Sequence, residues 1–527
     1  MNRVKNISLD NKLMVNEVLR NELIKQLALL VISGASSDEL ERKKLRLSEQ
    51  YNIGDVVRNS DILEYIGQNY PEDYEKARLT LRTKPVRTGS GIANIAVMWT
   101  GECPGQCSYC PTVPGAPKSY TGVEPATLRA QRASFDPVAQ IKNRLSQLKA
   151  IGHSTDKCEL IIMGGTFLAA SVEYQRSFVN SCYDALNGFA SASLEDAQKV
   201  NETAENRCVG LTVETRPDYC TDSDIAHLLS YGCTRVELGV QSLYDDVLRA
   251  VNRGHAVSET IAATKRLKDA GLKVCYHIML GLPGSTTEMD IEMFRSLFNN
   301  PDFQPDELKI YPTLVIPGTQ LHQQWLVGEY KPLTTEKAAR MLVEIKQLVP
   351  EYVRIKRIMR DISEKRVDAG ASTTNLRQLV HYKMQDERKQ CRCIRCREVW
   401  QHMKSGELPE NIELLTREYE ASGGRELFIS YEDAGKGILV AFLRLRLIGR
   451  KAFVRELHVY GPMVSIGNAP EKEYQHRAYG RMLLQKVEDI AKSSGATELR
   501  ITSGVGVRDY YRRLGYNLEE HYMIKSL

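Results

Sequence analysis

The chain has 527 residues, 42% hydrophobic and 26% charged, and a formal net charge of +5. This composition is that of a globular protein, and the length predicts about three domains. There is no run of about 18 apolar residues, which argues against a membrane-spanning helix. The opening MNRVKNISLDNKLM lacks a signal-peptide core, so the twelve cysteines are expected as thiols or metal ligands in a reducing cytoplasm.

Residues 1–80 are expected to form a small helical unit. Apolar residues repeat at helical spacing from Val15 to Leu30, and a second amphipathic stretch runs from Ile62 to Leu81 with a break at Pro71. Five basic residues and no acidic ones lie between Lys76 and Gly101. Such clustering is typical of phosphate binding, but an ordinary solvated face is equally compatible with it. The unit is either a packing lid or a binding module.

From residue 92 to 315, short apolar strands alternate with amphipathic helices, which predicts an α/β fold with a parallel sheet. Six repeats are too few for a closed eight-stranded barrel, so residues 81–320 are expected to form a partial (β/α)6 barrel. Its chemistry should gather at the carboxyl ends of the strands. The expected strands are Ile92–Thr100, Glu159–Gly164, Val209–Glu214, Arg235–Val240, Lys273–Leu280 and Leu308–Pro312.

Three cysteines follow the first of these strands in the run GECPGQCSYCP. Cys103, Cys107 and Cys110 have C-x3-C-x2-C spacing. Three soft thiolates can hold three irons of a [4Fe–4S] cluster and leave the fourth iron open for S-adenosylmethionine. Tyr109, just before the last cysteine, is typical of radical S-adenosylmethionine enzymes. A structural zinc site is the alternative, but it needs four ligands, and no fourth Cys or His lies nearby in the sequence.

Polar or glycine-rich segments also follow the other expected strands, among them GGTF, ETRPD and GVQS. Lys309, near the end of the last strand, could face the same site but receives no role. By their strand-end positions, the candidates for holding S-adenosylmethionine are Gly164, Gly165, Glu214 and Gln241.

Residues 321–400 are expected to form a largely helical, basic linker. Between Arg354 and Lys404 there are 14 Lys and Arg against 6 Asp and Glu. The linker ends in CRCIRC, which supplies three sulfur ligands, and an upstream histidine completes the four ligands of a structural zinc site. A second iron–sulfur cluster and idle thiols are the competing interpretations. The expected zinc ligands are Cys391, Cys393, Cys396 and His381.

Residues 401–527 are expected to form a second α/β domain, in which strands come first. Strands at Leu427–Tyr431, Ile438–Leu447 and Phe453–Val459 precede an amphipathic helix that starts near Gly480. The preceding segment QHRAYG is close to the Q/R-x-x-G-x-G/A loop of GCN5-related (GNAT) acetyltransferases. The backbone N–H groups of that loop, at a helix N-terminus, take up the pyrophosphate of coenzyme A. Ala478 stands here where the pattern has its middle glycine.

Two adjacent tyrosines, Tyr510 and Tyr511, lie on a later helix of this domain. Neighbouring tyrosines on a helix are usually packing residues. In the GNAT fold, however, one phenol commonly lies by the thioester, where it can donate a hydrogen bond or a proton.

A radical S-adenosylmethionine barrel and a GNAT domain in one chain resemble the family of Elongator catalytic subunits. The resemblance runs from about residue 80 to the end, and the family's QHQGFG loop appears here as QHRAYG. The segments that carry it include GHSTDKCELIIMGGTF, ETRPDYC, YGCTRVELGVQS, LKIYPTLVIPGT, RELHVYG and SGVGVRDYYRRLGY.

The resemblance implies a tRNA-modifying acyltransferase that builds a carboxymethyl group on C5 of the wobble uridine. In this reaction an electron from the cluster cleaves S-adenosylmethionine, and the deoxyadenosyl radical takes a hydrogen from the methyl group of acetyl-CoA. The carbon radical adds to the uridine, and hydrolysis of the thioester completes the product. The implied partners are the tRNA anticodon loop, acetyl-CoA and an electron donor, without a membrane. Whether the chain forms a homodimer stays open.

The resemblance also assigns site residues. Lys157 is expected at the end of a helix in the barrel. By their clustered charge, the basic stretches 76–87 and 354–397 are candidates for binding tRNA phosphates, and the helical region is a further candidate for tRNA binding. The catalytic candidates are Tyr511, Tyr510 and His458. The implied acetyl-CoA contacts are Lys157, Glu456, Leu457, His458, Val459, Tyr479, Gly480, Arg481, Met482 and Tyr511.

Three other functions are compatible with parts of the sequence. The first is a protein lysine acetyltransferase with a structural cluster, although a structural cluster would need four ligands. The second is a non-catalytic tRNA-binding scaffold, which the intact cysteines and tyrosines disfavour. The third is a radical enzyme acting on a small metabolite, which the basic linker disfavours mildly.

Overall fold

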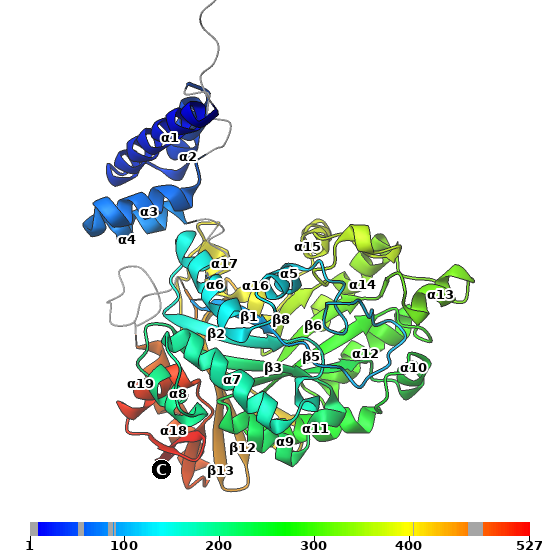
Figure 1. Ribbon diagram of the computed structural model, residues 1–527. Helices are drawn as coiled ribbons and strands as arrows, with labels where there is room; N and C mark the ends of the chain where they lie inside the picture. The colour runs from blue at the N-terminus through cyan, green and yellow to red at the C-terminus, as the bar shows by residue number, and fades with distance from the viewer. Residues whose placement is uncertain (1–8, 51–56, 83–87, 89–90, 404, 462–477) are drawn as a thin grey trace, which may run out of the picture. The chain divides into compact units, whose positions relative to one another are not determined.

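The computed structural model describes residues 9–50, 57–82, 88, 91–403, 405–461 and 478–527 (Figure 1). It consists of two compact units, one formed by residues 1–88 with 143–155 and the other by residues 89–142 with 156–527. Among the described residues, none of the helices combines the length and apolar character needed to cross a bilayer.

The first unit is helical, as predicted. Leu23 and Leu27 of the first helix pack with Ile62 and Ile66 of the third in one buried cluster. Pro71 separates the third helix from the fourth, because proline cannot donate the hydrogen bond that would continue a helix. The helices that precede the first sheet are α1 (Leu9–Ile32), α2 (Ser37–Gln50), α3 (Asn59–Asn69) and α4 (Tyr74–Leu81).

The second unit begins with a parallel sheet of seven strands in the order β1-β2-β3-β4-β5-β6-β8. All six predicted strands are present. The seventh, β8, lies in the segment that was expected to be a helical linker and pairs with β6. The strands are β1 (Ala93–Met98), β2 (Lys157–Met163), β3 (Arg207–Thr215), β4 (Arg235–Gln241), β5 (Lys273–Leu280), β6 (Glu307–Pro312) and β8 (Arg354–Ile358).

Helices follow most of these strands, and Figure 1 shows α7, α9, α11 and α12 on the outer face of the sheet. A two-residue pair, β7 (Leu314–Val315) with β9 (Ala369–Gly370), lies beyond β6. The helices are α5 (Pro125–Arg132), α6 (Pro137–Ala150), α7 (Val172–Asn187), α8 (Leu194–Asn201), α9 (Asp222–Ser230), α10 (Asp245–Ala250), α11 (Val257–Asp269), α12 (Thr287–Asn299), α13 (Gln320–Leu326), α14 (Thr335–Leu348), α15 (Leu376–Asp386), α16 (Ile394–Arg397) and α17 (Val399–Met403).

This sheet is strongly curved, and its inner face is polar. Lys309 on β6 donates a hydrogen bond to Glu214 on β3, although β4 and β5 lie between these strands. Such a contact requires the sheet to curl around its inner face. Along β2 every second residue, from Lys157 to Met163, is partly exposed, while the residues between them are buried. The fold is therefore the open partial barrel that the sequence predicts, with an accessible interior.

The C-terminal part forms a second, mostly antiparallel sheet in the order β10-β11-β12-β13-β14-β16-β15. Its first strand was not predicted, because charged residues alternate along this exposed edge strand. Leu483, Leu484 and Val487 of α18 pack on the sheet. The elements are β10 (Glu413–Ala421), β11 (Gly424–Asp433), β12 (Ile438–Ile448), β13 (Lys451–Val459), α18 (Tyr479–Ser493), β14 (Glu498–Ile501), α19 (Arg508–Arg512), β15 (Asn517–Glu519) and β16 (Tyr522–Ser526).

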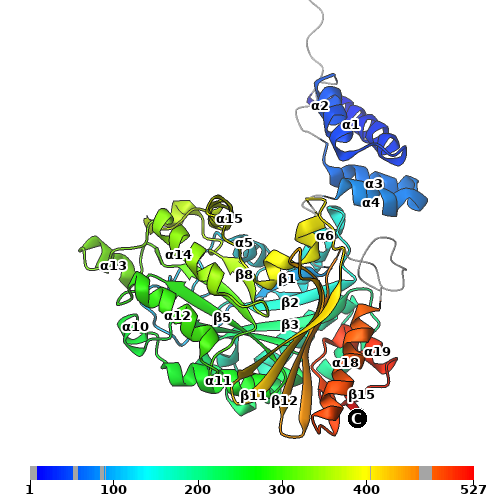
Figure 2. The ribbon, with the colours of Figure 1, turned by 180° about the vertical axis from the view of Figure 1, so that it is seen from behind.

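The second sheet packs against the amino-terminal ends of the barrel strands (Figure 2). Arg455 of β13 donates to both carboxylate oxygens of Asp306, just before β6, at 2.6 and 2.7 Å. Arg354, the first residue of β8, donates to the Tyr460 hydroxyl at 2.6 Å. Gly504 lies so close to Val209 near the start of β3 that a Cβ atom would overlap its carbonyl group. The carboxyl ends of the strands are about 20 Å away, the length of a six-residue strand.

Candidate active site

The loop after β1 carries the first cysteine trio at the carboxyl ends of the strands. Cys110 donates its backbone N–H to the Cys107 carbonyl at 3.0 Å, which folds the last two cysteines into one turn. The Cys103 sulfur lies 3.3 Å from the Thr166 hydroxyl. Arg253 donates to the Cys107 sulfur at 3.5 Å. The loop is thus held by groups from the segments that follow β2 and α10.

The spacing of these three sulfurs fits a cluster better than a single ion. Burial, and to a smaller extent the nearby Cys107, raise the pKa of Cys110 to about 12. Yet the three sulfurs are not among the groups of described ligand atoms that lie within 4.8 Å of one another. Thiolates around one zinc ion stand about 4 Å apart, given Zn–S bonds of about 2.3 Å. Thiolates on separate irons of a cluster stand farther apart, so this donor set fits [4Fe–4S] chemistry.

Gly164 and Gly165 follow β2 and lie against the cysteine loop. Their φ angles are 125° and 101°, values that L-residues with a side chain rarely adopt. A Cβ atom at Gly164 would stand 2.7 Å from the Trp99 carbonyl oxygen, and one at Gly165 would stand 3.3 Å from the Cys103 Cβ. These glycines therefore allow the loop after β2 to approach the cysteines.

Glu214 and Gln241 end their strands on the same side. Glu214 accepts a hydrogen bond from Lys309 at 3.0 Å. Gln241 has a φ of 70°, and its buried Oε1 makes no hydrogen bond to the described residues. A strained residue with an unsatisfied buried oxygen is a typical ligand-binding feature. Both candidates therefore lie at the carboxyl ends of barrel strands.

Two arginines that the sequence interpretation did not select also belong to this site. Arg216 and Arg253 line a cavity of about 340 Å³ together with Gly105, Gln106 and Asp218. Arg216 is paired with Asp218 at 2.8 Å, but its buried Nη1 has no hydrogen-bond partner among the described residues. The strand-end segment ETRPD was the sequence signal for Arg216, whereas nothing local in the sequence connects Arg253 with the cysteines.

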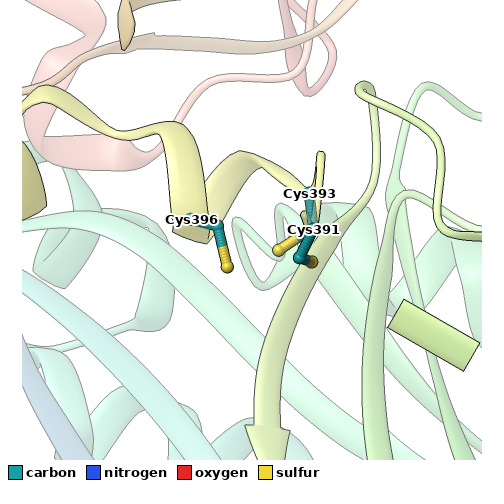
Figure 3. A group of neighbouring side chains, drawn as sticks. All are labelled: Cys391, Cys393 and Cys396. Atoms are coloured by element: carbon teal, nitrogen blue, oxygen red, sulfur yellow. The ribbon is translucent and has the colours of Figure 1, made fainter. Parts of the chain in front are cut away.

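The second cysteine trio has the geometry of a single-ion site. The sulfurs of Cys391, Cys393 and Cys396 all lie within 4.8 Å of one another, and Figure 3 shows them gathered around the start of α16. The backbone N–H of Ile394 donates to Val353 just before β8 at 2.9 Å, which anchors the motif. His381 is exposed on α15 and is not part of this group. The structure therefore brings together three of the four predicted zinc ligands.

In the second domain, the first turn of α18 meets one of the two tyrosines. A Cβ atom at Gly480 would stand 3.0 Å from the Tyr510 hydroxyl, so the glycine leaves room for this phenol. Tyr479 and Tyr510 pack at the edge of the core, whereas Tyr511 is 6% exposed within it. Arg481 and Met482 follow in the same turn. Gln475 to Arg477 lie outside the described residues.

Strand β13 carries the other implied acetyl-CoA contacts. The register with β12 shifts at Arg444, so Arg455 forms a bulge, and the pairing of β13 with β14 covers only Lys451–Val454 among the described residues. Beyond this point lie Leu457, His458 and Val459. The His458 ring stacks on Phe442, with the centroids 6.1 Å apart. The two strands thus part where a ligand could enter between them.

The Glu456 side chain, in contrast, points to the barrel. It accepts hydrogen bonds from Lys273 at 3.0 Å and from Arg444 at 2.8 Å. Burial alone would raise the pKa of Glu456, but these two cations hold it well below its usual range. Its carboxylate is therefore engaged in the interface between the two sheets.

Lys157 begins β2, and its predicted position at the end of a helix is wrong. The mistake arose because the helical pattern before it ends at Ala150 and a short loop separates the two elements. Lys157 pairs in register with Arg207, against which Gly506 packs closely. Burial lowers the pKa of Lys157. It thus lies at the edge of the barrel where the second domain is attached.

The basic segment 354–397 is partly turned inward. Arg354 pairs with Glu398 at 2.9 Å, and Lys356 lies 3.4 Å from Glu237. Arg388 and Arg392 are exposed. Lys84 and Arg87 of the other basic stretch lie outside the described residues.

The fold and the site together define a radical S-adenosylmethionine barrel fused to a GNAT acetyltransferase domain. Family models agree with this assignment: the radical SAM superfamily matches residues 97–297, its C-terminal domain 305–386, and the acetyltransferase (GNAT) family 394–516. The ELP3 N-terminal domain matches residues 17–89. Radical SAM membership implies a [4Fe–4S] cluster and S-adenosylmethionine, and GNAT membership implies acetyl-CoA.

Whole-length relatives show the family. The chain is 48% identical to the tRNA uridine(34) acetyltransferase of Methanocaldococcus infernus, over 93% of this chain and 95% of the relative. It is 44% identical to Elongator complex protein 3 of Schizosaccharomyces pombe, over 93% and 94%. A solved structure of N-terminally truncated Elp3 from M. infernus matches with a TM-score of 0.75 and 46% identity, over 83% of this chain and 100% of that one. The protein belongs to the Elongator complex protein 3 family.

Proposed function

We propose that this protein modifies the wobble uridine of tRNA, using a radical generated from S-adenosylmethionine and the acetyl group of acetyl-CoA to form carboxymethyluridine. Its relatives, a tRNA uridine(34) acetyltransferase and an Elongator complex protein 3, support the substrate and the acyl chemistry. The observation that carries the proposal is the fixed attachment of the acetyltransferase domain to the radical barrel through buried ion pairs such as Arg455–Asp306.

Fixed attachment matters because uridine C5 is a carbon and a poor target for polar acyl transfer. On the inner side of β2, every second residue from Lys157 to Met163 keeps some exposed surface. An acetyl group held beside Lys157 would have to pass along this side of β2 to reach the cysteine end. This arrangement supports a single reaction shared by the two domains.

At the cysteine end, Cys103, Cys107 and Cys110 would hold the cluster, which supplies the carbon-centred radical chemistry when S-adenosylmethionine is bound. Gly164, Gly165, Glu214 and Gln241 would position S-adenosylmethionine. The orphaned Gln241 Oε1 supports this role. Arg253 would place a permanent positive charge beside the Cys107 ligand.

At the acetyl-CoA end, the first turn of α18 (Tyr479 to Met482) would receive the coenzyme's phosphates. Leu457 to Val459 would line its arm through the backbone of β13, and Lys157 would contact it from the barrel. For proton donation to the thioester, Tyr510 is better placed than Tyr511, because its hydroxyl faces the first turn of α18. His458 remains a second candidate.

The other proposed partners are tRNA, an electron donor and a second copy of the chain. The exposed arginines of the 354–397 segment and the helical unit would contact tRNA phosphates around the anticodon loop. An electron donor must reach the cluster, and a homodimer remains a proposal. All twelve cysteines are free thiols, which suits a reducing cytoplasm.

For the second cysteine trio we favour a structural zinc ion bound by Cys391, Cys393 and Cys396. The short distances among the sulfurs suit one ion and not a cluster. His381 would have to move to complete the four protein ligands that a structural zinc site needs.

The test is to incubate the anaerobically reconstituted protein with tRNA, S-adenosylmethionine and acetyl-CoA, and to analyse the nucleosides by mass spectrometry. Carboxymethyluridine should appear with the wild type and disappear with Cys110→Ala. Acetyl-lysine formed without S-adenosylmethionine, and no modified uridine, would instead favour a lysine acetyltransferase.

A further inference from the structure

The inner face of the barrel carries a cluster of charged side chains directly beneath the cysteine loop. Lys309 of β6 donates to Glu214 of β3 at 3.0 Å and also contacts Glu237 of β4. His277 of β5 lies 2.8 Å from Oε2 of Glu237, the same oxygen that Lys309 contacts. Parallel barrels usually fill this position with branched apolar residues, and buried ion pairs seldom repay their desolvation cost. The cluster therefore needs an explanation beyond packing.

This cluster lies within reach of the radical site. Tyr311, two residues after Lys309 on the same face, packs in one group with Tyr109 and Met279, against which Cys107 and Cys110 lie. The rings of His277 and Tyr311 are nearly perpendicular to each other, with the centroids 5.8 Å apart. Two strand residues span about 7 Å. A group held by Lys309 and His277 would thus lie just below the cysteine loop.

Three side chains of the cluster keep a small exposed area. The side chains of Lys309, Glu214 and His277 are 10%, 13% and 15% exposed, whereas the carboxylate of Glu237 is completely buried. Glu237 thus forms the base of the group, and the other three side chains face the interior of the barrel.

A metal ion is a poor occupant for this position. Glu237, Cys275 and His277 do lie close enough to ligate one. However, the ammonium groups of both Lys309 and Lys356 lie against Glu237, and two cations at the shared carboxylate oppose the binding of a third. A neutral ligand with hydrogen-bonding groups fits better.

The hydrogen-bonding role of each side chain in the cluster, as donor or acceptor, can be assigned. The Glu237 carboxylate can only accept, so the neutral His277 ring donates its Nε2–H to it and presents Nδ1 as an acceptor. Lys309 has three N–H groups, and its two carboxylate partners leave one as a donor. The interior therefore offers one donor beside one acceptor, with the aromatic ring of Tyr311 next to them.

We propose that Lys309 and His277 read the Watson–Crick edge of the target uracil, with Lys309 donating to the O4 carbonyl and His277 Nδ1 accepting from N3–H. Cytosine presents the opposite order, an amino donor and a ring-nitrogen acceptor, and would meet both groups with the wrong polarity. Enzymes that act on a base commonly read its displaced edge by hydrogen bonds and aromatic contact. This assignment rests on the proposed function, and it makes the two residues positioning and specificity residues.

A binding experiment without cluster or cofactor tests this assignment. Anticodon stem–loops with uridine or cytidine at the wobble position are titrated against the full chain by fluorescence anisotropy. The wild type should prefer uridine by about tenfold, the cost of one mismatched edge. Lys309→Met should bring the ratio close to one, because it removes the donor. The control Lys265→Met, on the exposed surface of α11, should keep the wild-type ratio.

His277→Phe provides a second variant in case Lys309→Met does not fold, as judged by thermal melting. It keeps a ring of similar size and removes the acceptor, so the preference for uridine should again be lost. A wild type that binds both stem–loops equally, or folded variants that keep the preference, would overturn the assignment. Failure of the proposed function has a different signature: the preference for uridine stands, but no carboxymethyluridine forms.

Discussion

Tyr510 and Tyr511 are neighbours in the sequence, but their side chains lie in different environments. The Tyr510 hydroxyl faces Gly480 in the first turn of α18, whereas Tyr511 belongs to the core between α18 and the sheet. Burial raises the pKa of both phenols, so both are protonated at neutral pH and able to donate. Only one of them faces the expected coenzyme site.

Tyr510→Phe should therefore lower acetyl-CoA turnover about 100-fold, the lower range for loss of a general acid, while leaving the melting temperature almost unchanged. Tyr511→Phe, the matched control, should stay near wild-type activity. Release of free coenzyme A in the presence of tRNA measures both. The opposite ranking of the two variants would assign the donor role to Tyr511.

Asp290 supplies a pH dependence at a single residue. It is 2% exposed and accepts a hydrogen bond from the Gly281 backbone at 2.6 Å. Burial raises its pKa to about 6 from the ordinary 3.8. The folded protein thus keeps this proton up to about pH 6, whereas the unfolded chain loses it near pH 4, so the unfolding free energy falls as the pH rises across this window.

Asp290→Asn keeps an oxygen acceptor without the charge and should stabilise the protein at pH 7.5 by up to about 3 kcal/mol. The gain should vanish near pH 4, where the native carboxyl is also neutral. Denaturant unfolding at both pH values measures the difference, and an equal gain at both would exclude the titration of Asp290 as its source.

At the scale of elements, the attachment of β13 to the start of β6 holds the two sheets together. Arg455 is completely buried and contacts Asp306 and Glu426 at 2.6 and 2.7 Å. Removing one partner of such a group leaves buried charges uncompensated, which typically costs 3–5 kcal/mol. A second domain that depends on this contact should loosen before the barrel does.

Arg455→Met should accordingly destabilise the chain by about 4 kcal/mol and expose the junction between the domains to protease. Arg455→Lys retains one positive charge, so its stability should lie between those of the wild type and Arg455→Met. Chemical denaturation and limited proteolysis report the effect. A variant that unfolds at the wild-type midpoint would show that apolar packing, and not this ion pair, holds the junction.

The sequence predicted the helices and strands whose apolar residues recur at a regular spacing. It missed strands in which charged residues obscure that spacing. The six barrel strands and α18 have regular apolar patterns, and their positions are confirmed. The five residues of β8 were taken as part of a basic helix because Arg354, Lys356 and Arg357 dominate the segment. Lys356 is in fact turned toward Glu237 and Glu307 inside the barrel. Composition cannot reveal on which side of a short strand its charges lie.

The candidate site was predictable to the extent that its residues are neighbours in sequence. The two cysteine runs and the glycines after β2 are local motifs, and they lie where the pattern placed them. Arg253 reaches Cys107 from 146 residues away, and Lys309 reaches Glu214 from 95 residues away. Such contacts depend on the curvature of the sheet, which no local pattern encodes.

At the scale of the whole molecule, RNA binding should depend on the outward-facing part of the basic segment. Arg388 and Arg392 are exposed, unlike the ion-paired Arg354 and Lys356. Changing both to Glu should weaken tRNA binding and reduce the slope of log affinity against log salt by about 2. Arg340→Glu on α14, also exposed, is the control. An unchanged slope in the double variant would show that RNA contacts another part of the protein.

The buried arginines of the junction also limit how this protein can be taken apart. Arg444, Arg446 and Arg455 belong to the C-terminal domain, yet each contacts an aspartate of the barrel. Expressed on its own, the acetyltransferase half would present these guanidinium groups to solvent without their counter-charges. Chimeras that exchange only one half between related enzymes would mismatch the same contacts. The two halves should therefore be inherited, and engineered, as a single piece.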